Sequence, residues 1–273
     1  MESISEERRQ KLIAKIQEFC LFDDDFMSKV FEDDKEATEL LLSIILKRTD
    51  LTVTESKGQV SVKNLQGRSV RLDIKAKDKA GKLYNIEVQR ADGGACEKRA
   101  RYYSAVLDTN FLLPKMDFEQ LPETYVIFIT EHDVFGRNLP LYTIERTVQE
   151  DGVIFDDKAH IIYVNGENKD DTALGKLMQD FSCKVPENMN YELLAEKTKY
   201  FKQDDKGVSK MCKIMEDLRQ EGRLEGRQEG RLEGKLLAYI DLIKSGLLTV
   251  KDAALKLGMT EEKLKEQIRT SAI

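Results

Sequence analysis

Residues 71–90, RLDIKAKDKAGKLYNIEVQR, constrain the fold most because they predict two strands joined by a tight turn. Apolar and polar residues alternate in 71–76 and again in 85–89, which is the period-two pattern of half-buried strands. Residues 78–82 between them are polar and include a glycine, as expected of a turn. The stretch therefore predicts a hairpin whose apolar side chains share one face of a sheet.

The other face of this hairpin would gather Asp73, Glu87 and Gln89. Two carboxylates on adjacent strands repel each other unless a positive charge lies between them. Mg²⁺ takes carboxylate oxygens as ligands and keeps positions open for water and phosphate. The spacing thus predicts a metal site with Asp73 and Glu87 as ligands and Gln89 orienting water. The alternative is a solvated hairpin face with surface ion pairs.

Seven segments between Phe31 and Cys212 carry a resemblance to a known family. They are ATELLLSIIL, GRSVRLDIKAKD, YNIEVQRAD, KRARYYSAVLD, LPETYVIFITE, HIIYVNG and LGKLMQDF. Together they resemble the PD-(D/E)XK nuclease family transposases, which are related to recombination-promoting nucleases. Leu72 stands where the family motif has proline, and Gln89 stands where the motif often has lysine.

The resemblance implies a metal-dependent DNA endonuclease that hydrolyses phosphodiester bonds in transposition or recombination, in a bacterial cytoplasm. It implies Mg²⁺ as cofactor, with Mn²⁺ as a substitute, held by Asp73 and Glu87. Glu39 matches the family position of an acidic residue near the metal, and its alternative role is that of an ordinary surface residue. Because Gln89 replaces the lysine, a second function stays open. It is a catalytically silent DNA-binding or oligomerising protein that retains the nuclease fold.

Positive charge is concentrated around the predicted site, although the whole chain has a net charge of −6. Residues 57–101 contain 12 Lys or Arg against 5 Asp or Glu. Such a patch attracts phosphate without sequence preference, although lysine-rich turns also serve simply to keep hairpins soluble. The residues expected to contact nucleic acid are Arg90, Arg99, Arg101 and Lys75.

Hydrophobic periodicity elsewhere predicts an α/β fold with a restriction-endonuclease-like core. The expected core elements are a helix capped by Asp34 and running to about Arg48, strands over 51–54 and 59–64 joined by a turn that contains Gly58, the hairpin, a helix over 95–107 and a buried strand over 125–130. The run of aspartates at 23–25 predicts an acidic turn before the first of these helices. Arg99 and Tyr103, spaced i, i+4 on the later helix, would project together. The order α-β-β-β-α-β is that of a mixed sheet flanked by helices. Further strands are expected over 141–148 and 161–165.

The C-terminal part has a different pattern and predicts an α-helical extension. Residues 207–244 are helical in pattern, and from Glu221 to Leu236 they contain EGRL, EGRQ, EGRL and EGKL. Each interior glycine costs about 1 kcal/mol relative to alanine, so an isolated helix would be marginal. One hypothesis is that residues 219–236 pair with a second copy, the Glu stripe of one helix facing the Arg stripe of the other. The alternative is a solvated connector.

The predicted organisation has three parts: a nuclease-like domain over 1–205, a long helix over 206–245 and a small helical segment over 246–273. The last segment has the outline of a helix-turn-helix, but its second helix carries three glutamates, which suits packing or partner binding better than a DNA groove. Four scattered cysteines predict free thiols in a reducing cytoplasm. No apolar run approaches the length of a membrane span.

Overall fold

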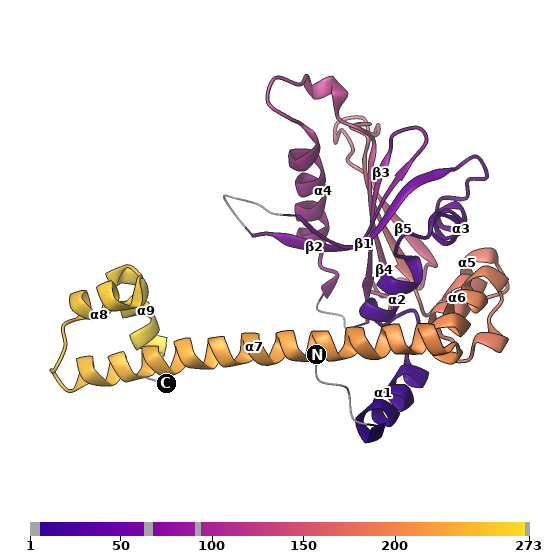
Figure 1. The fold of residues 1–273 in the computed structure, drawn as a ribbon. Helices are drawn as coiled ribbons and strands as arrows, with labels where there is room; N and C mark the ends of the chain where they lie inside the picture. Colours follow the sequence, from indigo (N-terminus) through magenta and orange to yellow (C-terminus); the bar gives the residue numbers. More distant parts are fainter. Residues whose placement is uncertain (1–5, 63–67, 91–93, 271–273) are drawn as a thin grey trace. The chain divides into compact units, whose positions relative to one another are not determined.

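The structure, a computed structural model, describes residues 6–62, 68–90 and 94–270 (Figure 1). The chain divides into two compact units, Met1–Met211 and Cys212–Ile273. None of the helices in the described ranges combines the length and apolar character of a membrane span.

A six-stranded mixed sheet forms the centre of the first unit (Figure 1). Its strands are β1 (Val53–Val62), β2 (Val70–Asp78), β3 (Leu83–Gln89), β4 (Thr124–Thr130), β5 (Leu141–Ile144) and β6 (Ala159–Asn165). Their spatial order is β1-β2-β3-β4-β6-β5. Strands β1, β2 and β3 pair antiparallel, β3, β4 and β6 pair parallel, and β5 returns antiparallel to β6. This arrangement confirms the predicted α/β restriction-endonuclease-like core.

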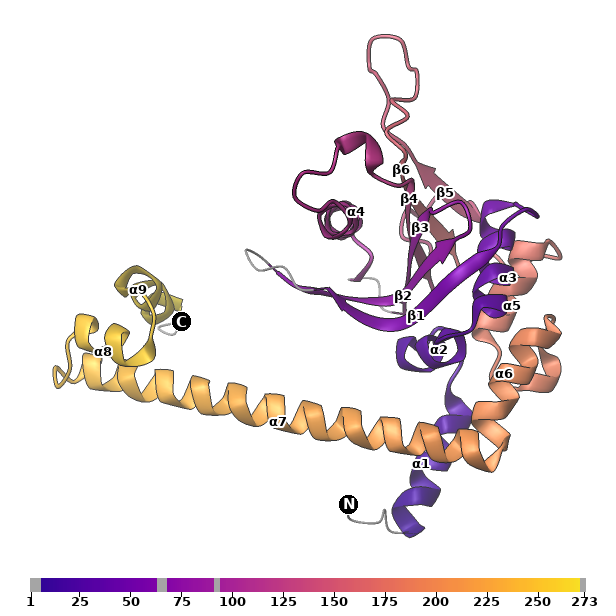
Figure 2. The ribbon, with the colours of Figure 1, turned by 45° about the horizontal axis from the view of Figure 1, so that its top comes forward.

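Helices cover both faces of the sheet. The helices of the first unit are α1 (Glu6–Glu18), α2 (Asp24–Phe31), α3 (Lys35–Leu46), α4 (Glu97–Phe111), α5 (Ala173–Ser182) and α6 (Glu192–Gln203), with short 3₁₀ turns at Phe118–Gln120 and Pro186–Asn188. Figure 2 shows α4 on one face and α2, α3 and α5 on the other. Asp34 caps α3 by accepting a hydrogen bond from the Ala37 N–H, as predicted. Helix α4 starts and ends later than the predicted range 95–107.

Aromatic stacking fixes α4 against the sheet. The Tyr103 ring lies 6.1 Å from that of Phe128, which lies 5.3 Å from that of Tyr163, and all three residues are buried. Buried rings of this size dominate the packing energy of a core. Helix α4 is thereby held at a fixed height over strands β4 and β6, which positions its polar residues relative to the neighbouring hairpin.

The prediction of separate strands over 51–54 and 59–64 was wrong, because β1 is one continuous strand. Gly58 lies inside it, paired with Ile74 of β2. A Cβ at Gly58 would stand 2.9 Å from the Ser28 carbonyl oxygen and 3.2 Å from the Cβ of Glu32, both on the α2 side. The glycine therefore allows α2 to approach the strand and does not make a turn. Strand β5 also ends earlier than predicted, at Ile144.

The second unit contains most of α7 (Asp205–Lys244), together with α8 (Val250–Leu257) and α9 (Glu261–Thr270). Thr249 caps α8 by accepting from the Asp252 N–H, and Gly258 ends it with φ of +66°. Ala253, Ala254 and Leu264 are buried against the last turns of α7, so the predicted long helix and small segment share one core. The predicted Glu stripe consists of positions 221, 225, 229 and 233; the side chains at the first three lie outside the described residues, and that of Glu233 is exposed.

Candidate active site

The candidate site lies where the main-chain pairing of β2 with β3 ends, at Ile74 and Ile86. Beyond that point the Asp73 N–H donates to Glu87 Oε1 at 3.2 Å, and the Val88 N–H donates to Asp73 Oδ2 at 3.0 Å. Two carboxylates thus take the places that carbonyl oxygens hold in a regular ladder. Each side chain is oriented by the backbone of the opposite strand, and the hairpin places both acids together as predicted.

Burial makes the ionised form of these two carboxyl groups unfavourable, and the charge of Arg99 offsets this only in part. Glu87 has no exposed surface. Burial, and then repulsion from Asp73, raises the pKa of Glu87 from 4.5 to about 8. Burial also raises the pKa of Asp73 from 3.8 to about 6, and the charge of Asp24 adds to this rise. A pair of neighbouring carboxyl groups with raised pKa values is typical of a site that binds a cation.

Asp24, at the start of α2, lies near enough for its charge to act on Asp73, a neighbour that sequence reasoning missed. Burial, followed by repulsion from Asp25, raises the pKa of its own carboxyl. A cavity of about 260 Å³ opens beside it and is lined by Phe22, Asp23, Asp24, Val88, Gln89 and Arg90. The sequence signal is the run of three aspartates at 23–25, which was interpreted only as an acidic turn.

Arg99 of α4 links the acid pair to the last motif position. Its Nη2 donates to Glu87 Oε2 at 3.1 Å, and its Nη1 donates to Gln89 Oε1 at 3.2 Å. Its Nε donates to the Tyr103 hydroxyl at 2.9 Å, and the guanidinium lies over the same ring at 5.0 Å. The predicted i, i+4 neighbours Arg99 and Tyr103 therefore do project together. Tyr103 is also the residue that packs α4 on the sheet, so the same helix face anchors α4 and positions Arg99.

Glu39 is not brought to the pair. Its carboxylate accepts a hydrogen bond from the Val53 N–H at 2.8 Å, and Val53 pairs with Asp78 at the end of β2 remote from Asp73. In the described ranges no three acidic, histidine or cysteine side chains converge closely enough to hold a metal ion. The expectation that Glu39 lies near the metal is therefore not met, because α3 presents it to the first N–H of β1.

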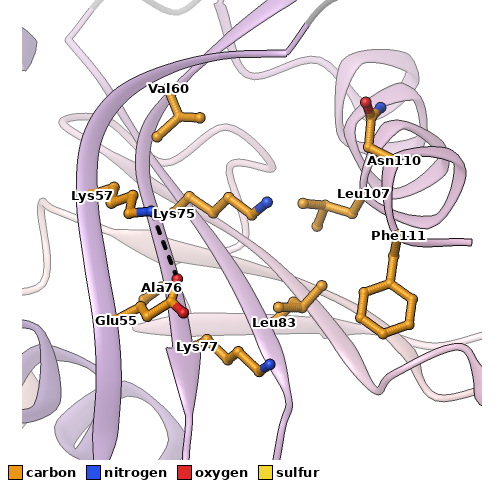
Figure 3. A pocket seen from close by; sticks show the side chains of 10 residues that line it. All are labelled: Glu55, Lys57, Val60, Lys75, Ala76, Lys77, Leu83, Leu107, Asn110 and Phe111. Carbon is orange, nitrogen blue, oxygen red and sulfur yellow. Dashed lines mark ion pairs between the residues drawn. The ribbon is translucent and has the colours of Figure 1, made fainter.

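The other predicted contact residues lie at different distances from the pair. Arg90 follows Gln89 and is held by Asp23 and Glu131. Arg101 is exposed on α4. Lys75 lies two residues beyond Asp73 on β2 and lines a separate cavity between the strands and α4 (Figure 3). Of the four basic residues, Arg99 contacts the acid pair directly.

Asn85 is a second residue that sequence reasoning missed. It precedes Glu87 by two positions on β3, so both side chains point to the same face. It is fully buried and lies close enough to lower the pKa of Glu87. Neither of its side-chain polar atoms makes a hydrogen bond of good geometry with the described part of the chain. Buried amides without a partner are rare in folded proteins and commonly mark a place for water.

The side chains around Asp73 and Glu87 fit a hard divalent cation. They offer carboxylate oxygens, which Mg²⁺ and Mn²⁺ prefer as ligands. Their raised pKa values indicate that a positive charge nearby would stabilise the ionised carboxylates. Mg²⁺ is commonly bound through one or two carboxylates while it keeps several waters. Waters of that kind would also give the Asn85 amide the partner it lacks. Arg99 supplies part of the positive charge from the protein itself.

Comparison with known proteins gives one family match. A family model described as PD-(D/E)XK nuclease family transposase matches residues 25–229. No curated protein and no solved structure matches the chain.

Proposed function

The chain belongs to the PD-(D/E)XK nuclease family transposases, and from this membership we propose a metal-dependent endonuclease that hydrolyses phosphodiester bonds of DNA. Its setting would be transposition or recombination in a bacterial cytoplasm, with Mg²⁺ as cofactor and Mn²⁺ as a substitute. The observation that supports the proposal best is the buried pair of Asp73 and Glu87, each held by the opposite strand. A protein that only bound DNA would gain nothing by placing two acids near phosphate.

Asp73 and Glu87 would hold the cation. When bound, such a cation lowers the pKa of a coordinated water and neutralises charge on a phosphate. Gln89 accepts from Arg99 through Oε1, which directs its amide N–H groups away from the guanidinium and toward water or phosphate. Arg99 provides the positive charge that a motif lysine would supply. Its bonds to Glu87 and Gln89 hold that charge at the edge of the acid pair.

A second candidate is a catalytically silent DNA-binding or oligomerising protein that keeps the fold. It is favoured by one observation, the Arg99–Glu87 ion pair at 3.1 Å, which neutralises part of the charge that a metal would meet. Calorimetric titration separates the two candidates. The nuclease binds Mg²⁺ or Mn²⁺ with a signal that Asp73→Asn removes, whereas the silent protein gives no such signal.

The activity test is Mg²⁺-dependent cleavage of plasmid DNA by wild type, Asp73→Ala and Asp73→Asn. Asparagine keeps an oxygen for the Val88 N–H and so preserves the hairpin, whereas alanine removes this acceptor. Both variants should lose cleavage, and Asp73→Asn should retain the wild-type circular dichroism spectrum. Asp171→Asn, an exposed aspartate remote in sequence, is the matched control. Undiminished cutting by Asp73→Asn would show that the metal site is wrongly assigned.

A further inference from the structure

Two cavities follow one another between strands β1–β2 and helix α4. The first, about 690 Å³, is lined by the start of β2 and the first turns of α4, including Arg68, Arg71, Lys98 and Arg99. The second, about 270 Å³, is lined further along both elements, by residues 75–77 of β2 and by 107, 110 and 111 of α4 (Figure 3). The two cavities lie along the same two elements, one on each side of position 73 of β2, and are together termed the α4 groove; Arg99, which contacts Glu87, lines the first of them.

The second cavity has a surplus of positive charge. Lys57, Lys75 and Lys77 extend from β1 and β2 into it, as Figure 3 shows. Lys57 and Lys75 are direct cross-strand partners, an arrangement that destabilises a sheet. The acid on its wall, Glu55, lies 3.9 Å from Lys57, while Lys75 and Lys77 make no ion pair within the described ranges. Such unpaired like charges suit a polyanionic ligand.

The same cavity has an apolar side formed by the sheet and by α4. Leu83, Leu107 and Phe111 line it opposite the lysines, and Asn110 lies at the α4 side (Figure 3). Lysines contact phosphate as point charges, and aromatic rings stack on bases without regard to sequence. Cations on one side and a flat apolar surface on the other match a nucleotide whose base is unstacked and accessible.

The size of the groove distinguishes a single strand from a duplex. The second cavity, at about 270 Å³, is slightly smaller than the roughly 300–1,000 Å³ of small-ligand sites, so one nucleotide is the largest unit it admits. A duplex keeps its bases paired inside and cannot place one against Phe111. From Asp73 to Lys77 the strand rises about 13 Å, which corresponds to a few nucleotides of one chain at about 3.4 Å or more each.

We propose that the α4 groove binds one unpaired DNA strand, which runs from the first cavity past position 73 of β2 to the lysine cavity. The inference rests on the proposed function and specifies its substrate as DNA with a single-stranded segment beside the cut. The basic residues of the first cavity position the phosphates near Asp73 and Glu87. The three lysines of the second cavity hold the strand further on, and Phe111 stacks on a base.

The test is fluorescence anisotropy with a labelled single-stranded oligonucleotide and the matching duplex, in EDTA so that no cleavage occurs. The full chain is compared with a Lys57→Gln, Lys75→Gln, Lys77→Gln triple variant. A second triple variant, Lys169→Gln, Lys176→Gln and Lys199→Gln, removes the same charge from exposed positions elsewhere in the first unit. Thermal melts followed by circular dichroism verify that all variants are folded.

The groove variant should bind the single strand at least tenfold more weakly at 0.1 M salt. Its slope of log K against log salt should fall by about 2, because each lost phosphate contact accounts for about 0.7. The control triple variant should lose only the small affinity that follows from removing three positive charges anywhere on the protein. Its salt slope should stay close to that of wild type. Phe111→Ala should weaken single-strand binding roughly tenfold and leave the salt slope unchanged.

An unchanged affinity and salt slope in the groove variant, or tighter wild-type binding to the duplex than to the single strand, would overturn the assignment. Neither result would affect the nuclease proposal, which is decided by cleavage in Asp73→Asn. Conversely, the cleavage test could contradict the nuclease proposal while the protein still prefers the single strand. The α4 groove would then be a DNA-binding site without catalysis.

Discussion

Replacing Glu87 by glutamine should make the metal-free protein more stable at alkaline pH and remove most of its pH dependence between pH 5 and 8. In the folded protein the pKa of Glu87 is raised from 4.5 to about 8 by burial and by Asp73. Between these values the folded chain binds more protons than the unfolded chain, so the free energy of unfolding falls as pH rises.

The size of the effect follows from the shift. One pKa unit corresponds to 1.36 kcal/mol, so a rise from 4.5 to about 8 gives at most about 5 kcal/mol. Part of that fall is shared with Asp73, because the two carboxyl groups titrate as a pair. We therefore expect the wild-type protein to lose about 3 to 5 kcal/mol between pH 5 and pH 8.5. Glu87→Gln should lose only a small part of it, since one buried charge is gone.

The assay is urea unfolding in EDTA, followed by circular dichroism at half-unit steps from pH 5 to pH 8.5. Glu150→Gln, which removes an exposed carboxyl group in the loop between β5 and β6, is the control and should follow wild type. Addition of Mg²⁺ at pH 8 should stabilise wild type by mass action and leave Glu87→Gln unchanged. Parallel wild-type and Glu87→Gln curves would refute the reasoning, because they would mean that Glu87 ionises as a surface carboxyl does.

Three further predictions concern other features. Arg99→Gln should lower the free energy of unfolding by about 2 to 3 kcal/mol at pH 8.5, where Glu87 loses its buried partner, and by much less at pH 5; equal losses at both pH values in urea unfolding would contradict this. Gly58→Ala should destabilise by about 1 to 3 kcal/mol, because its Cβ would press on Ser28 of α2, whereas Gly222→Ala, with open space around its Cβ, should stabilise by up to about 1 kcal/mol; calorimetric melts compare the two. Deletion of residues 219–236 removes about five helical turns and keeps the phase of α7; multi-angle light scattering should show a smaller assembly, and an unchanged oligomeric state would remove the pairing hypothesis.

Local patterns predicted much of the fold because its main strands bury regular faces. The alternation in 71–76 and 85–89 produced the correct hairpin, and the run at 125–130 is the buried strand β4. The same pattern placed Asp73 beside Glu87, since their neighbours Ile74 and Ile86 are in register. Helical spacing likewise placed Arg99 beside Tyr103. In each case the information lies within one or two adjacent elements.

The rest depends on how distant elements meet, which periodicity does not specify. Asp24 lies near enough to act on Asp73 through its charge because α2 packs against β2 and β3, whereas its sequence predicts only an acidic turn. Glu39 lies on the expected helix, but the height of α3 along the sheet directs it to Val53. The sequence predicts a turn at Gly58 because a glycine required for close helix packing cannot be distinguished, by sequence alone, from a glycine required for a bend.

The carboxylates of Asp73 and Glu87 each accept a hydrogen bond from a backbone N–H of the opposite strand, and this limits which inactivating substitutions the fold tolerates. Loss of activity through alanine at position 73 would leave the Val88 amide without an acceptor inside the sheet and would threaten the whole hairpin. Loss through asparagine removes the charge and keeps the hydrogen-bond acceptor. Inactivated descendants that still accumulate as folded protein should therefore carry amides at these two positions more often than small aliphatic residues, and pseudogenes should not show that bias.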